Sequence, residues 1–312
     1  MLASLIRRRR ARAILLIALI VLFLYNFLPR AQRTSRNSAA RFSLRATRPP
    51  RIQHPFAPTD GADHERRQAV KEEFLHAYGR YKERAWLRDE VKPVSGGSET
   101  KYCGWAATLI DSLDTLYIMG LYEEFDVAVE AVSRISFSYP PSIFCSINPF
   151  ETAIRHLGGL LAAYDVSGGE DVRLQRQAVA VGQVLMKAYA RNGVQCRSII
   201  WPRLPGWSCE PGDILSLARI GSQSLEFIRL SQISSNAKWA REIDFLVGQL
   251  ERLQNTSHIP GLWPRVFNGD CAEGICHRSN PEQFFTVGAA ADSAYEYLLK
   301  ACLASCLPWL YC

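Results

Sequence analysis

Segments with a helical apolar period dominate this 312-residue chain from about Glu65 onward. In eight segments, apolar residues recur three and four positions apart, which is the spacing of one face of an α-helix. No sustained alternation typical of strands competes with this pattern, so the sequence predicts an all-α fold. The segments are residues 70–86, 106–119, 123–135, 150–164, 172–189, 214–230, 237–253 and 285–299.

The loops between these segments are short and similar in composition, as at residues 119–123, 166–170 and 231–235. Gly after a helix and Ser or Glu before the next are stop and start signals. Loops this short make consecutive helices antiparallel neighbours, so the repeated unit is a helical hairpin. Repeated hairpins close either as a solenoid or as a toroidal α/α barrel, and the sequence period alone does not separate the two.

The N-terminal region has a different character. Residues 13–29 carry no charge and follow an arginine cluster at residues 7–12. This run is at the short end of the length that spans a bilayer, and no small-x-small cleavage site follows it, so a signal anchor is favoured over a cleaved signal peptide. The arginines favour a cytoplasmic tail at residues 1–12. Residues 30–64, rich in Arg, Ser, Pro and Ala, are predicted to form a flexible stem.

Positive charge is concentrated in this N-terminal region. Residues 1–51 contain 12 Arg and no Lys, Asp or Glu, whereas the remainder carries 25 basic against 30 acidic residues. No stripe of Lys and Arg interleaved with aromatic residues occurs in the remainder. We therefore expect contact with a membrane through the anchor and no binding of nucleic acid.

Nine cysteines and a glycosylation sequon fit a lumenal body. The cysteines form no C-x-x-C pair, and no His cluster has metal-ligand spacing, so disulfides are favoured over a zinc site. Their pairing cannot be deduced from the sequence. The sequon is Asn255-Thr256-Ser257, which is expected in a chain that enters the secretory pathway.

Acidic residues interrupt several of the apolar helical segments. A buried carboxylate must be paired, hydrogen-bonded or used chemically to offset its desolvation, so these residues are candidates for one site. Asp111 lies within the apolar stretch GWAATLIDSLDTLYIMGL, at residues 104–121. Glu151 and Arg155 are four residues apart, so their side chains meet on one helix face. A local ion pair explains that spacing as well as a shared site does.

Asp292 and Glu296 repeat the four-residue spacing with like charges. A structural helix gains nothing from this repulsion, whereas glycoside hydrolysis uses one carboxylic acid and one carboxylate. Two solvated acids on an exposed face are the alternative. Glu226 is a lone acid on an apolar face, which taken alone is more often a structural carboxylate.

In order along the chain, these blocks closely resemble the class I α-1,2-mannosidases of glycosyl hydrolase family forty-seven. Several ordered blocks across most of the chain make accidental similarity very improbable. The blocks are residues 89–93 (DEVKP), 104–121, 150–161 (FETAIRHLGGLL), 221–230 (GSQSLEFIRL), 261–264 (GLWP) and 292–300 (DSAYEYLLK).

The resemblance implies an (α/α) barrel that removes terminal α-1,2-linked mannose from high-mannose N-glycans with inversion, helped by a calcium ion. It also implies a single-pass type II membrane protein of the endoplasmic reticulum or Golgi, with the catalytic part lumenal. By position, Glu151 matches the general acid and Asp292 a second acid/base carboxylate that acts through water. The matched residues for glycan binding are Asp111, Arg155, Glu226 and Glu296.

The chain departs from the family pattern at several points. The family has Glu where this chain has Arg219, and often a large side chain where Ala290 stands. The resemblance stops near Lys300, which leaves residues 65–300 as the N-terminal part of a catalytic domain and 301–312 as a Cys-rich tail. The remaining barrel helices, a third catalytic carboxylate and the Thr that ligates calcium fall beyond this point in the family. We therefore expect a C-terminally truncated partial barrel, with uncovered apolar helix faces and no calcium ligand of its own.

Three functional hypotheses follow. The first is an α-1,2-mannosidase of N-glycan processing whose activity is impaired in this chain. The second is a non-catalytic protein of glycan quality control that binds mannose. The third is a truncated gene product without function.

Overall fold

The computed structural model describes residues 62–141, 145–189, 196, 198–200, 208–210, 214–271, 274–276 and 284–305. All of them belong to one compact unit, Thr47–Cys312. The predicted cytoplasmic tail, the anchor at residues 13–29 and nearly all of the predicted stem lie outside the described residues. The last three residues of that stem, 62–64, begin the first described helix. Among the described residues, no helix combines the length and the apolar character that a bilayer span needs.

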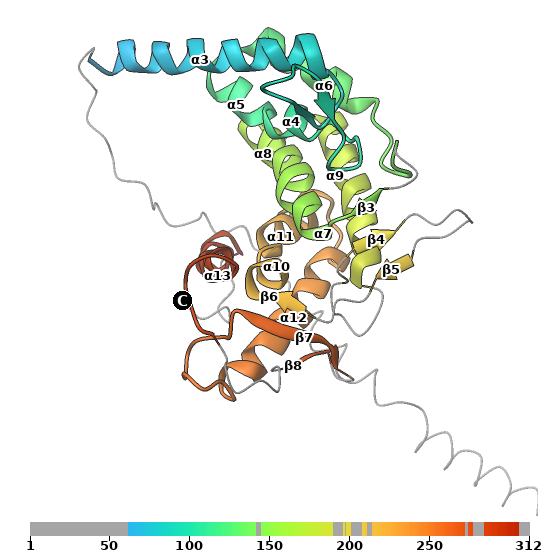
Figure 1. Cartoon of the computed structure of the whole chain (residues 1–312), viewed down its shortest axis with the longest axis vertical. Coiled ribbons are helices and arrows are strands. Elements are labelled where there is room, and N and C mark those ends of the chain that lie inside the picture. The colour runs from blue at the N-terminus through green and yellow to red at the C-terminus, as the bar shows by residue number, and fades with distance from the viewer. Residues whose placement is uncertain are drawn as a thin grey trace, which may run out of the picture. The chain divides into compact units, whose positions relative to one another are not determined.

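Helices make up most of the described part (Figure 1). Helix α3 (Ala62–Ala85) carries acidic residues in its first turn and basic residues in its last, which complements the helix dipole. The other helices are α4 (Ala107–Asp111), α5 (Leu113–Ile118), α6 (Tyr122–Ser133), α7 (Pro149–Glu151), the π-helical η1 (Thr152–Leu157), α8 (Gly158–Val166), α9 (Val172–Leu185), the 3₁₀-helical η2 (Met186–Tyr189), α10 (Leu217–Gly221), α11 (Ser224–Ile233), α12 (Lys238–Gln254) and α13 (Asp292–Ser305).

Three small antiparallel sheets are the main difference from the all-α prediction. In the first, β1 (Glu90–Val91) pairs with β2 (Ser98–Glu99). Strands of two to six residues are too short for an alternating pattern to stand out, which is why the sequence did not indicate them. The second and third sheets are β3 (Ser146–Ile147), β4 (Ser198–Ile200) and β5 (Ser208–Glu210), and β6 (Ile214–Ser216), β7 (Val266–Cys271) and β8 (Gly274–Cys276).

Two helix predictions are wrong at their N-terminal ends. Residues 214–216 are strand β6, and the helical pattern begins only at α10, where the Ser216 side chain caps the helix by accepting from the Arg219 N–H. The segment 285–291 is not helical, because Phe285 forms a bridge with Pro264 and Ala290 has a φ of 70°. Helix α13 therefore starts at Asp292, which places this acid at the exposed first turn.

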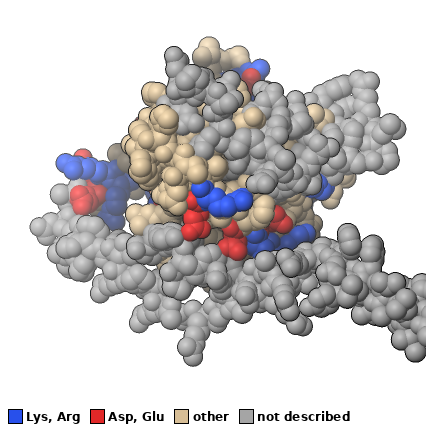
Figure 2. Space-filling model, turned by 90° about the horizontal axis from the view of Figure 1, so that it is seen from below, with Lys and Arg blue, Asp and Glu red and all other residues tan. Residues whose placement is uncertain are grey.

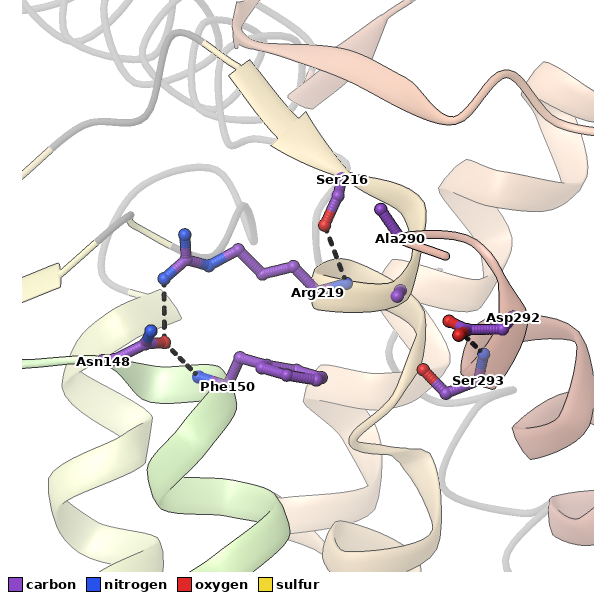
Figure 3. Close-up of a pocket in the computed structure, with 8 residues that line it drawn as sticks. Asn148, Phe150, Ser216, Arg219, Ala290, Asp292 and Ser293 are labelled. Carbon is purple, nitrogen blue, oxygen red and sulfur yellow. Dashed lines mark hydrogen bonds between the residues drawn. The ribbon is translucent and has the colours of Figure 1, made fainter. Parts of the chain in front are cut away.

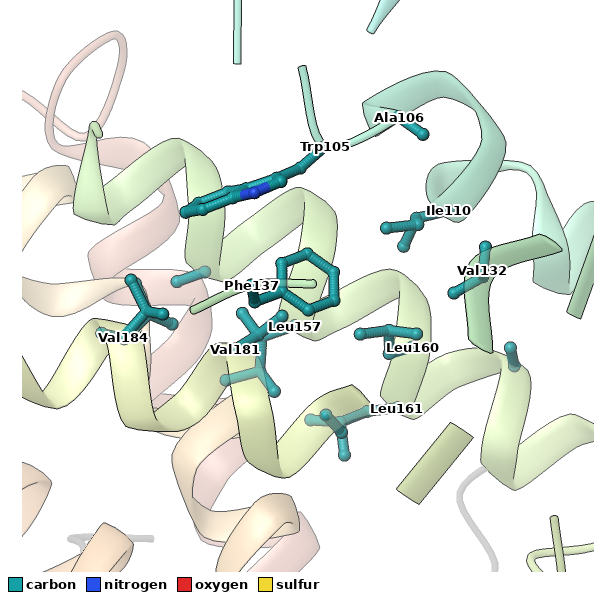
Figure 4. Close-up of a cluster of buried hydrophobic side chains, with 14 of the residues drawn as sticks. Trp105, Ala106, Ile110, Val132, Phe137, Leu157, Leu160, Leu161, Val181 and Val184 are labelled. Carbon is teal, nitrogen blue, oxygen red and sulfur yellow. The ribbon is translucent and has the colours of Figure 1, made fainter. Parts of the chain in front are cut away.

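The described apolar core has two clusters. The larger packs α4, α6, α8 and α9 around Trp105, Phe137 and Leu157 (Figure 4). The smaller joins β6, α10, α12, β7 and α13 through residues such as Phe267 and Trp263. Trp105 and Trp263 are thus core residues, while Trp201 and Trp207 lie outside the described residues.

Close helix approaches hold these clusters in position. A Cβ added at Gly159 on α8 would lie 2.8 Å from the carbonyl oxygen of Ile110 on α4. A Cβ added at Gly221 on α10 would lie 2.6 Å from the Cβ of Ala294 on α13. Distances this short exclude any side chain at either position, so glycine is what allows each pair of helices to touch.

The disulfide prediction is confirmed by a bond between Cys103 and Cys145, residues separated by 42 positions. It ties the loop before α4 to the segment that leads into β3 and α7. Cys196 and Cys302 are disulfide-bonded as well.

Charged side chains of both signs are interspersed on the molecular face shown in Figure 2. Elsewhere in the described part, charged side chains form ion pairs, such as Arg229 with Asp165 at 2.6 Å and Lys82 with Glu124 at 2.7 Å. On the part of this face that is described, no broad area of one sign stands out.

His156 is fully buried against the rings of Trp105 and Phe137. Burial, assisted by the positive charge of Arg155, lowers its pKa to about 4. In the unfolded chain this histidine is protonated below about pH 6.5, whereas in the folded protein it stays neutral down to about pH 4. The free energy of unfolding should therefore fall by about 3 kcal/mol as the pH drops from 6.5 to 4.

We expect His156→Phe to remove this dependence, measured by urea unfolding at a series of pH values between 7 and 4. His76→Gln, at an exposed position, is the control and should leave the pH dependence unchanged. An equal slope in the wild-type chain and in His156→Phe would show that the histidine is not the group responsible.

Candidate active site

The helix that carries Glu151 begins at a well-defined cap. The Asn148 side-chain oxygen accepts from the backbone N–H groups of Phe150 and Glu151, at 3.1 and 3.4 Å, and Pro149 occupies the first helical position. The chain then enters the π-helical turn η1, which carries Arg155. Such turns within helices occur frequently at functional sites.

Arg155 joins two of the predicted site carboxylates. Its Nε donates to Glu151 Oε2 at 2.9 Å, and its Nη1 lies 3.5 Å from Asp111 Oδ2 on α4. The guanidinium also lies 4.9 Å from the centre of the Tyr102 ring, a cation–π contact. The local ion pair expected from the spacing is therefore present, and it extends to a third residue from another helix.

Asp111 is in an unusual environment for a partly exposed acid. Burial raises its pKa to about 6, although Arg155 acts to lower it. Its side chain is still 42% exposed, so this carboxyl is within reach of a bound molecule. An acid that titrates near neutral pH at an accessible position is a common feature of catalytic and binding sites.

A hollow of about 350 Å³ lies near the start of α7 (Figure 3). We call it the Asp292 hollow. It gathers residues from four places in the chain: the cap of α7, the junction of β6 and α10, the loop before α13, and the first turn of α13. The lining residues are Asn148, Phe150, Ser216, Ala218, Arg219, Ala290, Asp292 and Ser293.

Helices α7 and α13, which carry Glu151 and Asp292, both contribute residues to this hollow. Phe150, which immediately precedes Glu151, lines the same hollow as Asp292. Asp292 is exposed, and its Oδ1 accepts from the Ser293 N–H at 2.9 Å. The structure therefore brings the N-terminus of α7, through Phe150, and the N-terminus of α13 to one hollow, whereas Glu151 itself is not among the lining residues. The assignment of Glu151 and Asp292 as catalytic residues stays a prediction.

Glu296 does not join them. It is exposed and paired with Lys300 one turn further along α13, and it is absent from the lining of the hollow. In the structure, Glu296 is a solvent-exposed acid, which is the alternative considered in the sequence analysis. Its assignment to glycan binding stays a prediction.

Glu226 lies on α11 and is buried against α8 and α13. It is 6% exposed, accepts a hydrogen bond from the Tyr297 hydroxyl at 2.8 Å, and lies close to Gly158. Its second carboxylate oxygen, Oε2, has no hydrogen-bond partner in the described part. Burial raises the pKa of Glu226 to about 7, against the opposing effect of Tyr297.

Sequence reasoning did not anticipate three residues of this region. Tyr102 contacts Arg155, Tyr297 holds Glu226, and Asn148 caps α7. The pair Asn148-Pro149 is a helix-start signal that could have been recognised from the sequence. Tyr102 and Tyr297 lack such a signal, because each acts through a contact with a residue far away in the chain.

A calcium site was expected to lie beyond this chain. In the described ranges, no three His, Cys, Asp or Glu side chains gather closely enough to hold a metal ion. Ca²⁺ also binds backbone carbonyls, amide carbonyls and water, so the expectation about calcium stays a prediction, and no chemical step below depends on the ion.

The raised pKa of Glu226 predicts a pH-dependent stability. An unfolded Glu loses its proton near pH 4.5, whereas the folded protein holds it to about pH 7, so the free energy of unfolding should fall by about 3 kcal/mol as the pH rises across that interval. Glu226→Gln should abolish this loss, as measured by denaturant midpoints from pH 4 to 8.

Glu296→Gln, which changes an exposed acid on the neighbouring helix, is the matched control and should reproduce the wild-type curve. A Glu226→Gln protein that still loses stability between pH 4.5 and 7 would contradict the assignment.

Comparison with known proteins agrees with this architecture. Residues 73–306 match Glycosyl hydrolase family 47. A curated relative, Mannosyl-oligosaccharide 1,2-alpha-mannosidase MNS1 of Arabidopsis thaliana, is 38% identical over 78% of this chain and 42% of its own length. Mannosyl-oligosaccharide 1,2-alpha-mannosidase IA of Sus scrofa is 35% identical over 80% of this chain and 36% of its own length.

A solved structure shows the same fold. The alpha-1,2-mannosidase from Trichoderma reesei superposes with a TM-score of 0.68 and 27% sequence identity, over 76% of this chain and 50% of that one. The chain thus spans half or less of the length of these proteins. Within that span, the ordered motifs, the helical architecture and the family match all agree, and the chain belongs to glycosyl hydrolase family 47.

Proposed function

We propose that this chain is part of an enzyme that hydrolyses terminal α-1,2-linked mannose from high-mannose N-glycans with inversion. The observation that carries the proposal is the meeting of the Glu151 and Asp292 helices at one hollow, in a chain whose curated relatives are named as mannosyl-oligosaccharide 1,2-alpha-mannosidases. The hollow has the size of a small-ligand pocket, and both acids are accessible to solvent.

In the proposed reaction, Glu151 protonates the glycosidic oxygen of the leaving sugar, and Asp292 takes a proton from the water that attacks the anomeric carbon. Inversion requires the two carboxyl groups to lie on opposite sides of the sugar, with space for that water. Arg155 fixes the orientation of Glu151 through the 2.9 Å contact, and Asp111 offers a second acceptor for sugar hydroxyls.

Substitution of these two acids tests the reaction. In the full chain, Glu151→Gln and Asp292→Asn should each lower mannose release from a high-mannose N-glycan by about 100-fold or more, because each removes a proton-transfer group. Mannose release is measured by chromatography, and the anomer first formed by NMR, with β-mannose expected for inversion.

Asp165→Asn is the matched control, since this acid pairs with Arg229 on the surface and should leave the rate unchanged. Release of α-mannose as the first product would overturn the inverting mechanism. Unchanged rates in both acid variants would remove Glu151 and Asp292 from the chemistry.

A second candidate is a protein that binds mannose glycans without hydrolysis. The contact between Arg155 and Glu151 favours it, because a carboxylate held in a fixed orientation is a good acceptor for sugar hydroxyls. Glycan binding to the wild-type chain, with no release of mannose from it, would select this candidate over the hydrolase.

We also propose that the chain resides in the endoplasmic reticulum or Golgi, anchored by residues 13–29 with the body lumenal. The Cys103–Cys145 disulfide supports an oxidising compartment, and Asn255 is exposed at the C-terminal end of α12, where a glycan can be attached. A relative of Rattus norvegicus, 34% identical, is named as an endoplasmic reticulum enzyme.

Cell expression tests this topology. The chain should resist carbonate extraction from membranes, and deletion of residues 13–29 should abolish that resistance. Asn255→Gln should remove an endoglycosidase-sensitive mass shift, whereas Asn236→Gln, outside any sequon, should retain it. An unshifted wild-type band would place Asn255 outside the lumen.

A further inference from the structure

The Arg219 side chain lines the Asp292 hollow (Figure 3). It extends from α10 toward the cap of α7, and its Nη2 donates to Asn148 Oδ1 at 2.8 Å. This charged side chain thus makes a polar contact with the start of another helix. A hydrogen bond from a charged guanidinium to an amide oxygen is stronger than a hydrogen bond between two neutral groups.

The acceptor of this bond is the atom that caps the Glu151 helix. Asn148 Oδ1 accepts from Arg219 and from the backbone N–H groups of Phe150 and Glu151. An Asn side chain at a helix start can rotate away from its cap unless another group holds it. Arg219 is such a group, since Figure 3 shows that the same Asn148 oxygen contacts both the Arg219 guanidinium and the Phe150 N–H.

The other end of Arg219 is fixed to the Asp292 helix. Gly221 lets α10 touch Ala294 on α13, and Ser222 Oγ hydrogen-bonds Ser293 Oγ at 2.8 Å. The Ala218 N–H donates to the Ala290 carbonyl at 2.9 Å, two residues before Asp292. Helix α10 therefore moves with the N-terminus of α13, and Arg219 connects both to α7.

We propose that Arg219 is a positioning residue that sets the spacing between Glu151 and Asp292. It links the elements that carry the two acids: α10, bonded to α13, on one side and the Asn148 cap of α7 on the other. Its importance for the reaction rests on the proposed hydrolase function, but the mechanical link does not. A neutral or acidic residue at this position lacks the reach or the donor groups that the contact requires.

Amide hydrogen exchange tests the link without relying on activity. In Arg219→Ala, the amides of Phe150 and Glu151 should exchange about tenfold faster or more, because loss of the charged donor weakens the cap that protects them. Exchange in α12, which does not contact Asn148, serves as the internal reference and should not change.

Arg229→Ala is the matched control, since it removes an arginine with comparable hydrogen bonds, to Asp165, from the neighbouring helix α11. Arg219→Lys retains a donor and a positive charge, so it should recover part of the protection from exchange. If the alanine variant does not fold, Arg219→Lys is compared with the wild-type protein in its place. Equal exchange at Phe150 and Glu151 in the wild-type, Arg219→Ala and Arg219→Lys proteins would overturn the proposal. Faster exchange throughout the molecule in Arg219→Ala, including α12, would show a general structural role and would also overturn it.

Kinetics on the same variants separates this inference from the proposed function. If the chain hydrolyses mannose, Arg219→Ala should lower kcat about tenfold with little change in KM, because the acids are displaced while sugar contacts remain. A rise in KM alone would make Arg219 a binding residue and reject the positioning role. If no variant hydrolyses mannose but exchange responds as expected, the proposed function fails and the link stands.

Discussion

The site depends on close contact between helices at two glycines. Gly159 allows α8 to reach the backbone of α4, which brings Arg155 and Asp111 within 3.5 Å. Gly221 allows α10 to reach α13, which places Arg219 and Asp292 on one hollow. A methyl group at either position would push a helix outward by more than the tolerance of an ion pair or a catalytic contact. Packing density, more than any single polar bond, therefore determines whether these acids meet.

The polar contacts then fix orientation within that frame. Arg155 bridges Glu151 and Asp111, while Asn148 receives three donors at the start of α7. Each of these groups touches a partner from a different segment, so a displacement of one helix is felt by the others. Arg219 belongs to the same arrangement, since its guanidinium donates to the Asn148 amide oxygen.

The two buried titratable groups place limits on the pH at which the described part is most stable. His156 resists protonation, which favours the folded state above about pH 6.5, whereas Glu226 resists ionisation, which favours it below about pH 4.5 and progressively less up to about pH 7. Their effects oppose each other in the mildly acidic range. His156 is adjacent to Arg155 in the chain, and Glu226 lies close to Gly158. The unfavourable burial of each titratable group therefore occurs next to the helices that carry the predicted site residues.

The sequence by itself determined the helical class, most helix positions and the family, because apolar period and ordered motifs are local properties of the chain. It did not determine the strands β1–β8, the start of α13 at Asp292, the disulfide between Cys103 and Cys145, or the separation of Glu296 from the hollow. These depend on contacts between residues distant in the chain, such as Phe285 with Pro264 and Arg219 with Asn148. Tertiary structure decided them, since a hydrogen bond or a van der Waals contact exists only after separate segments have been brought to the same place.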